Sequence, residues 1–213
     1  MKNTNEENSE SELSEKESST QTSTGSSAKA SAKASAKTSV IKEIISWVVT
    51  IALALALGLF IRNHVIINAD IPSGSMENTI MTGDRIIGNR LAYISGEPKR
   101  GDIIIFKYPD DETQNFAKRI IGLPGEKVDI IDGKVYINDS ETPLEEDYLK
   151  EEWLIAAGPY SYTVPDDSYF VMGDNRNNSL DSRYWINTYV PRSSILGKAS
   201  LIYYPFDDAK FLN

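Results

Sequence analysis

The hydrophobic and polar residues divide the chain into three stretches of different character. Residues 1–39 are almost entirely polar or small, and Leu13 is the only large aliphatic residue after Met1. Residues 44–61 carry no charge and read IISWVVTIALALALGLFI, whereas the later apolar residues come in short β-branched runs separated by Gly, Pro and Asp. This pattern predicts three parts: a disordered tail (1–39), one transmembrane helix (40–62) and a folded domain (63–213).

The apolar stretch has the length and the flanks of a membrane anchor. As a helix it is about 27 Å long, close to the roughly 30 Å hydrocarbon core of a bilayer. Lys42 and Arg62 lie at its ends, where charged side chains can reach the headgroups. A cleaved signal peptide is the main alternative, but the small residues lie inside the stretch, and residues 62–65 offer no small-x-small site. We therefore expect an uncleaved anchor.

Positive charge lies on one side of this anchor. Lys29, Lys33, Lys37 and Lys42 precede the span, whereas Arg62 is the only Lys or Arg between the span and residue 84. The positive-inside rule then predicts a single-pass protein of the cell membrane, with a cytoplasmic N-terminus and an extracytoplasmic domain.

The domain is predicted to be mainly antiparallel β. Its apolar runs are short and rich in Ile, Val, Tyr and Phe, as strands are. Asp132-Gly133 between two of these runs is a strong hairpin signal. Only residues 144–154 could form a helix of useful length.

Composition excludes several classes of site. The chain has no Cys and one His, which excludes disulfide scaffolds, thiolate or multi-histidine metal sites and cysteine nucleophiles. We therefore expect no metal and no cofactor. With 22 Lys+Arg against 31 Asp+Glu and a net charge of −9, a sequence-independent nucleic-acid binder is not expected either.

A candidate nucleophile follows the anchor closely. In residues 71–76, IPSGSM, Ser73 and Ser75 flank a Gly that follows a Pro, a pattern that by itself indicates only a turn. A nucleophilic serine also needs a base. The single histidine, His64, lies at the headgroup level and is better explained as a polar anchor, so a lysine or a carboxylate remains.

Lys118 is the best candidate among the lysines. It lies in the run FAKRII (116–121), where alternate residues of a strand point to opposite faces, so either Lys118 or Arg119 faces apolar surroundings. A lysine with its usual pKa of about 10.4 is protonated at neutral pH, but burial can lower that pKa by roughly 3–5 units. Arg119 could not serve, because a guanidinium stays charged. An ordinary surface lysine is the alternative.

A polar loop supplies a third cluster. Residues 173–185 are dense in Asp, Asn, Ser and Arg, a composition typical of a loop that forms its own hydrogen bonds. Asp181 is expected to pair with Arg183 or Arg176. A calcium loop is the alternative, but the spacing of the acids does not match an EF-hand and the closing Glu is missing.

Taken together, these segments resemble the ordered sequence boxes of bacterial type I signal peptidase. The resemblance covers most of residues 65–205 and implies a largely antiparallel β fold. It also implies a Ser/Lys protease that cuts signal peptides from exported preproteins at the outer face of the membrane, so preproteins and the lipid bilayer are the expected partners. The segments that carry it, behind one anchor, are 71–76 with Thr79, 83–84, 100–106, 118–126 and 173–183.

The same resemblance implies a role for each motif residue. Ser75 would be the nucleophile and Lys118 the general base, while the Ser75 N–H and the Ser73 hydroxyl would form the oxyanion hole. Ser179 would orient the lysine amine. The supporting charged residues would be Asp174, Arg176, Asp181 and Arg183, and shallow pockets for small residues before the cut would be lined by Ile71, Met76, Ile80, Phe116 and Ala117.

Two positions depart from the family pattern. Asn78 stands where many members have Pro, and Ile186 follows the last motif where Gly is frequent. Both concern the geometry of the turn and of the substrate groove, and neither is a position of the Ser/Lys dyad.

One functional alternative remains open, an inactive β domain that keeps these segments as architecture and binds signal segments or a partner. A soluble self-cleaving Ser/Lys regulator does not fit an anchored chain, and a histidine-based signal peptidase does not fit because no His follows Ser75. Residues 26–29 match the Ser-x-x-Lys motif of penicillin-binding enzymes, but they lie in the tail, on the other side of the anchor.

Overall fold

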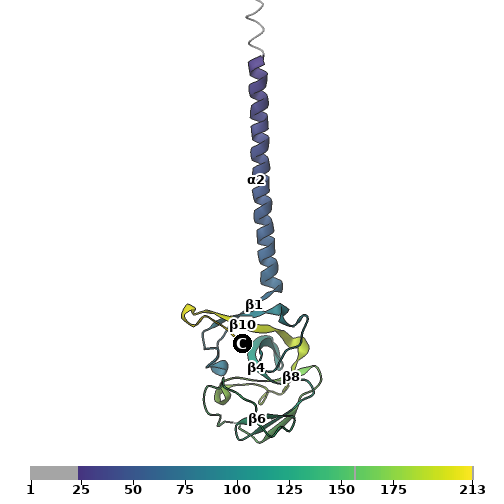
Figure 1. The fold of residues 1–213 in the computed structure, drawn as a ribbon, viewed down its shortest axis with the longest axis vertical. Helices are drawn as coiled ribbons and strands as arrows, with labels where there is room; N and C mark the ends of the chain where they lie inside the picture. The colour runs from purple at the N-terminus through teal and green to yellow at the C-terminus, as the bar shows by residue number, and fades with distance from the viewer. Residues whose placement is uncertain (1–23, 156, 213) are drawn as a thin grey trace, which may run out of the picture. The chain divides into compact units, whose positions relative to one another are not determined.

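A computed structural model describes residues 24–155 and 157–212 of the chain (Figure 1). The chain divides between Gly58 and Leu59 into a helical unit and a β unit.

The described part of the helical unit belongs to α2 (Thr24–His64), whose last residues, from Leu59 on, are counted with the β unit. Its part Val40–His64 is long and apolar enough to cross a membrane, and none of it is buried against protein. We expected residues up to 39 to form a disordered tail and the helix to begin at residue 40. In the structure the helix already begins at Thr24. The Ala-rich repeat before Val40 accounts for this difference, since alanine has the highest helix propensity. Residues 1–23, the rest of the predicted tail, lie outside the described residues.

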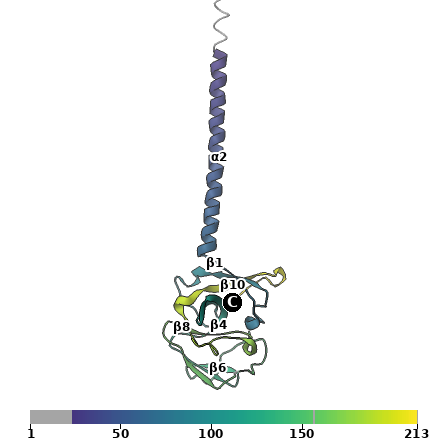
Figure 2. The ribbon, with the colours of Figure 1, turned by 180° about the vertical axis from the view of Figure 1, so that it is seen from behind.

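The β unit contains two antiparallel sheets, as the short apolar runs predict (Figures 1 and 2). In both views the smaller sheet around β6 lies at the end of this unit opposite β1. The larger sheet has the order β1-β2-β10-β3-β4-β8-β9, with β11 paired to β10, and the smaller has the order β6-β5-β7. The strands are β1 (Ile66–Asp70), β2 (Arg85–Asn89), β3 (Ile103–Tyr108), β4 (Asp111–Gly122), β5 (Lys127–Ile131), β6 (Lys134–Ile137), β7 (Tyr160–Thr163), β8 (Ser168–Met172), β9 (Val190–Pro191), β10 (Ile195–Tyr204) and β11 (Lys210–Phe211).

A tight hairpin and several short 3₁₀ turns lie between these strands. The hairpin is the predicted one at Asp132-Gly133, which joins β5 to β6. Ile131 pairs with Lys134, and φ is positive at both central residues, 48° and 73°. The turns are η1 (Gly74–Met76), η2 (Arg90–Tyr93), η3 (Arg176–Asn178), η4 (Arg192–Ser194) and η5 (Phe206–Asp208).

The long strand β4 connects the two halves of the larger sheet. It pairs with β3 through Ile104 and Lys118 and with β8 through Arg119 and Met172. Three clusters of buried aliphatic and aromatic side chains pack around these strands. The candidate lysine therefore lies on an interior strand that is paired on both sides.

The segment 144–154, which we predicted as the one possible helix, is irregular in the structure. Its side chains make tertiary contacts instead: Trp153 is buried in the cluster around β5 and β8, and Glu146 forms an ion pair with Arg176. These contacts fix the side chains in positions that do not follow a helical period.

The core gives a direct stability prediction. Ile86 on β2 is fully buried, whereas Ile186 is 91% exposed. We expect Ile86→Ala to lower the free energy of unfolding by about 2–5 kcal/mol, because it removes buried methyl groups and leaves a cavity. Ile186→Ala, the matched control, should change it by less than about 0.5 kcal/mol. Urea unfolding of the detergent-solubilised full chain measures both, and equal effects would contradict the assignment of Ile86 to the core.

Candidate active site

Ser75 lies in η1, the short turn that follows β1. Extended backbone at Ser73 leads into the turn, and Ser75 and Met76 are buried. Asn175 from the polar loop holds the turn at two points: its side-chain amide donates to the Gly74 carbonyl at 2.9 Å and its backbone N–H to the Ser75 carbonyl at 3.1 Å. The turn is thus fastened to a segment that lies far away in the sequence.

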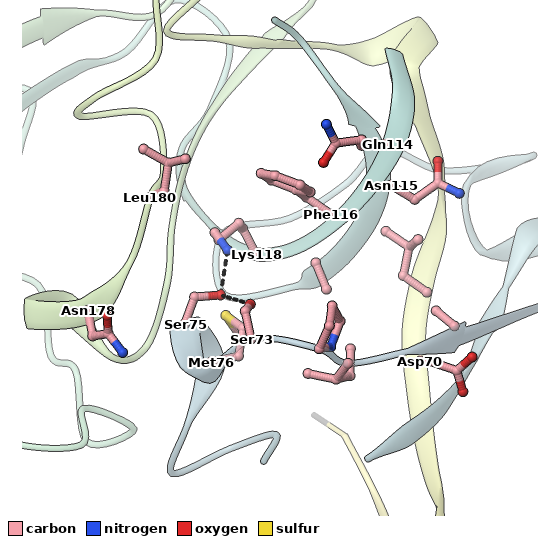
Figure 3. Close-up of a pocket in the computed structure, with 15 residues that line it drawn as sticks. Asp70, Ser73, Ser75, Met76, Gln114, Asn115, Phe116, Lys118, Asn178 and Leu180 are labelled. Atoms are coloured by element: carbon pink, nitrogen blue, oxygen red, sulfur yellow. Dashed lines mark hydrogen bonds between the residues drawn. The ribbon is translucent and has the colours of Figure 1, made fainter. Parts of the chain in front are cut away.

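Lys118 points from β4 toward Ser75. Its Nζ lies 2.6 Å from Ser75 Oγ, and Ser75 Oγ lies 3.4 Å from Ser73 Oγ (Figure 3). The lysine is only 4% exposed. Burial lowers the pKa of Lys118 to about 8, although the negative charges of Asp181 and Asp174 act in the opposite direction. A neutral amine is therefore accessible near neutral pH at hydrogen-bond distance from a serine hydroxyl.

Arg119, the next residue on β4, points to the other face, as the strand alternation requires. Its guanidinium binds the Asp174 carboxylate through two hydrogen bonds of 2.9 and 2.7 Å and donates to the Gly101 carbonyl at 2.7 Å. Thr79 donates to the same carboxylate at 2.5 Å. Asp174 thus connects β4 with the segment that follows η1.

The polar loop is built on a second buried ion pair. Of the two pairings that we considered for Asp181, the structure contains the one with Arg183, at 2.8 Å. Arg176 pairs instead with Glu146. Burial acts to raise the pKa of Asp181, but hydrogen bonds from Arg183 and the charge of Arg183, together with the Gly173 N–H, hold that pKa below its usual value. Asp181 is therefore a carboxylate that shapes the loop.

Ser179 was predicted to orient the Lys118 amine, which requires a hydrogen bond between the two side chains, and the structure shows no such bond between these two described residues. Its hydroxyl is buried, but it makes no hydrogen bond to another group in the described part of the chain. Gly173 lies beside it, and a Cβ at this glycine would lie 2.3 Å from both Ser179 Oγ and the Ser75 carbonyl. The close approach of the loop to the serine turn thus depends on a glycine at 173.

A cavity of about 410 Å³ opens beside the serine and the lysine (Figure 3). Of the five residues predicted to line substrate pockets, four line this cavity. The exception is Ile80, which is fully buried in the core cluster around β1, β2 and β10 and is not among the residues that line this cavity. The lining residues, which we call the groove, are Ala69–Ser73, Ser75, Met76, Ile105, Gln114–Lys118, Asn178 and Leu180.

Sequence reasoning missed several residues that hold the site together. Thr79, Arg119, Gly173 and Asn175 all lie inside the motifs, but only the structure gives them contacts. Their place inside the motifs was the one available signal. Glu146 and the residues around it carried no such signal, because they lie outside every motif.

Comparison with known proteins assigns the chain to a family. Residues 44–204 match the family model described as "Signal peptidase, peptidase S26". A "Signal peptidase I" of Leptolyngbya laminosa is 44% identical over 155 residues, which cover 69% of this chain and 73% of that protein. A "Probable signal peptidase I-2" of Synechocystis is 43% identical over 150 residues, which cover 68% of this chain and 66% of that protein.

A solved structure also matches, a signal peptidase I from Enterococcus faecalis V583. It is 40% identical, with a TM-score of 0.39, and the match covers 48% of this chain and 96% of that one. The match to the family model extends from the apolar span to the end of β10 and includes both Ser75 and Lys118. The chain therefore belongs to the signal peptidase family, peptidase S26.

Proposed function

We propose that this protein is a membrane-anchored serine endopeptidase that removes N-terminal signal peptides from exported preproteins by means of a Ser75/Lys118 dyad. The observation that carries the proposal is the 2.6 Å separation of Lys118 Nζ and Ser75 Oγ in a buried position. Burial of a lysine amine costs desolvation free energy. A lysine with a purely structural role would avoid this cost by keeping its amine in water. The relatives named as signal peptidases support the substrate class.

The first chemical step is acylation of Ser75. Neutral Lys118 accepts the hydroxyl proton while Oγ forms a bond to the carbonyl carbon of the scissile peptide. The negative charge on the carbonyl oxygen is stabilised by the Ser75 N–H and the Ser73 hydroxyl. The lysine then returns its proton to the nitrogen of the leaving amine as the C–N bond breaks, which releases the mature protein and leaves an acyl ester on Ser75.

Deacylation uses the same lysine, which is neutral again. It accepts a proton from a water molecule, the water oxygen bonds to the ester carbon, and the proton passes to Ser75 Oγ as the ester bond breaks. The products are the carboxylate of the signal peptide and the free serine. No group other than the residues of the site and a water is required.

The groove supports a preference for small side chains before the cleavage site. Met76, Phe116 and Ala117, which the resemblance assigns to shallow substrate pockets, line it next to the dyad. We propose that the groove accepts small residues at the first and third positions before the cut, as in Ala-x-Ala.

The span Val40–His64 supports the proposed location in the cell membrane. Lysines before the span indicate a cytoplasmic N-terminus and an extracytoplasmic catalytic domain. This arrangement suits a substrate whose own apolar segment stays in the bilayer while its cleavage site enters the groove.

Replacement of either dyad residue tests the enzyme against an inactive binding domain. We expect Ser75→Ala and Lys118→Ala each to lower the cleavage rate of a preprotein by at least about 10³-fold, because the nucleophile and its base act as a unit. Lys134→Ala, at an exposed position on β6, should retain wild-type cleavage. Detergent-solubilised full-length protein and gel analysis of the cleaved preprotein suffice, and undiminished cleavage by either dyad variant would refute the mechanism.

The pH dependence follows from the low pKa of the lysine. Only the neutral amine is a base, and the Lys118 pKa is about 8, so activity falls as the pH drops below this value. We expect kcat/KM to fall about tenfold per pH unit on the acid side and to level off above about pH 8. Initial rates between pH 5 and pH 10 measure this profile, and a rate that stays constant down to pH 5 would exclude Lys118 as the base.

The same pKa shift predicts a gain of stability when the lysine is removed. Because burial lowers the Lys118 pKa from 10.5 to about 8, the unfolded state binds the proton more tightly. The protonated lysine thus costs the folded state about 3 kcal/mol at pH 7, a cost that disappears as the pH rises from 8 to 10.5. Lys118→Met should therefore unfold at a higher urea concentration than wild type at pH 7. The difference between the two proteins should decrease by pH 10, and a difference that does not change with pH would refute this explanation.

A further inference from the structure

Residues 144–155 cross from the turn after Ser75 to the polar loop without regular secondary structure. We call this segment the strap. It lies outside every motif, yet it contacts each of the three pieces of chain that carry the dyad and its support.

The first contact holds the turn after the serine. The side-chain amide of Asn78 donates to the Tyr148 carbonyl at 3.0 Å and lies 3.4 Å from the Leu149 carbonyl. Beside it, Lys150 forms an ion pair of 2.6 Å with Glu77. The strap is thus attached to the two residues that follow Met76.

The second contact reaches β4. The Tyr148 ring lies against the Arg119 guanidinium, with 4.0 Å between the ring centroid and the guanidinium carbon. Arg119 is the neighbour of Lys118 and the partner of Asp174. A shift of Tyr148 would therefore act on the strand that carries the lysine.

The third contact secures the polar loop. Glu146 accepts hydrogen bonds from Arg176 at 2.5 and 3.1 Å, with side chains only 6% and 1% exposed, and also from the Tyr148 hydroxyl at 2.7 Å. Asn177 donates to the Glu152 carbonyl at 2.8 Å and accepts from the Leu154 N–H at 2.9 Å. The strap and the loop are therefore joined through both side-chain and backbone groups.

The backbone at Asn78 explains why this chain uses a side chain here. Asn78 has a φ of 89°, a conformation that a proline ring, which fixes φ near −65°, cannot adopt. Asparagine tolerates positive φ better than most residues. Where a proline would stiffen the turn through its ring, this chain ties the turn to the strap through an amide.

We propose that the strap positions Ser75 against Lys118, with Asn78 and Tyr148 as positioning residues, an inference that rests on the proposed function. Among the described residues, no strap residue lines the groove. The effect on catalysis should therefore appear in kcat, which depends on the geometry of the dyad, and not in KM.

Variants at Asn78 separate the hydrogen bond from the backbone conformation. Asn78→Gly keeps positive φ but loses the amide, so we expect kcat to fall about 3- to 10-fold with KM within about twofold of wild type. Asn78→Asp places a carboxylate opposite two carbonyl oxygens and should lower kcat further. Tyr148→Phe keeps the ring on Arg119 but loses the bond to Glu146, and should also lower kcat. Asp147→Asn, an exposed change within the strap, is the matched control and should match wild type.

Two further proteins distinguish positioning from simple loss of stability. Val190→Ala destabilises a core cluster that contains neither a strap residue nor a residue of the serine turn, and all rates are measured well below the unfolding temperature of every variant. The inference is overturned if both Asn78 variants keep wild-type kcat, if their whole effect lies in KM, or if Val190→Ala lowers kcat as much for the same loss of stability. Ser75→Ala separates the two proposals. If wild type cleaves no faster than Ser75→Ala, the proposed function fails and this inference with it, whereas an active wild type with insensitive Asn78 variants overturns the strap alone.

Discussion

The rest of the structure depends on one constraint, that the Lys118 amine be buried against the Ser75 hydroxyl. Desolvation of the ammonium costs free energy, and this cost makes the neutral amine accessible. The nearby carboxylates Asp181 and Asp174 act to restore the charge, and the Arg183 charge opposes them. Lys118 has no carboxylate as a direct salt-bridge partner within the described residues. The charges around it are arranged so that each acid is already occupied by an arginine.

This occupation of the acids explains why the site contains so many buried ions. Three buried ion pairs surround the site, and every side chain in them is at most 6% exposed. They are Arg119–Asp174, Arg183–Asp181 and Arg176–Glu146. Buried ion pairs contribute little net stability, because desolvation offsets their attraction. Their value here is geometric: the pairs Arg119–Asp174 and Arg176–Glu146 join segments that are distant in the sequence, and the pair Asp181–Arg183 shapes the polar loop itself. Loss of one partner would leave the other charge buried and unpaired, so the elements are bound to one arrangement.

Local features could be predicted from the sequence, and long-range pairings could not. The apolar span, the β-rich domain and the Asp132-Gly133 hairpin follow from periodicity and turn chemistry. The candidate serine and lysine follow from elimination and strand alternation, with the resemblance added. Ile80 was placed in the groove although it is a core residue, because a hydrophobic residue near a serine carries no mark of which way it faces. The pairing of Arg176 with Glu146 could not be predicted from the sequence either, because Glu146 is one of many acidic residues and lies outside every motif.

The two faces of β4 divide the work of the site. The groove is lined by Phe116 and Lys118 from one face of β4, by Ala117 from the opposite face and by Met76 of the serine turn, and most of its surface is aliphatic or aromatic. On the other side, Arg119 and Asp174 fix the strand to the turn and the loop. Because adjacent residues of a strand point in opposite directions, the chain can separate the desolvated base from the permanently charged guanidinium by a single peptide unit. The two neighbours therefore have different surroundings: Lys118, an amine whose charge can be removed, lines the groove, and Arg119, a cation whose charge cannot be removed, is paired with Asp174.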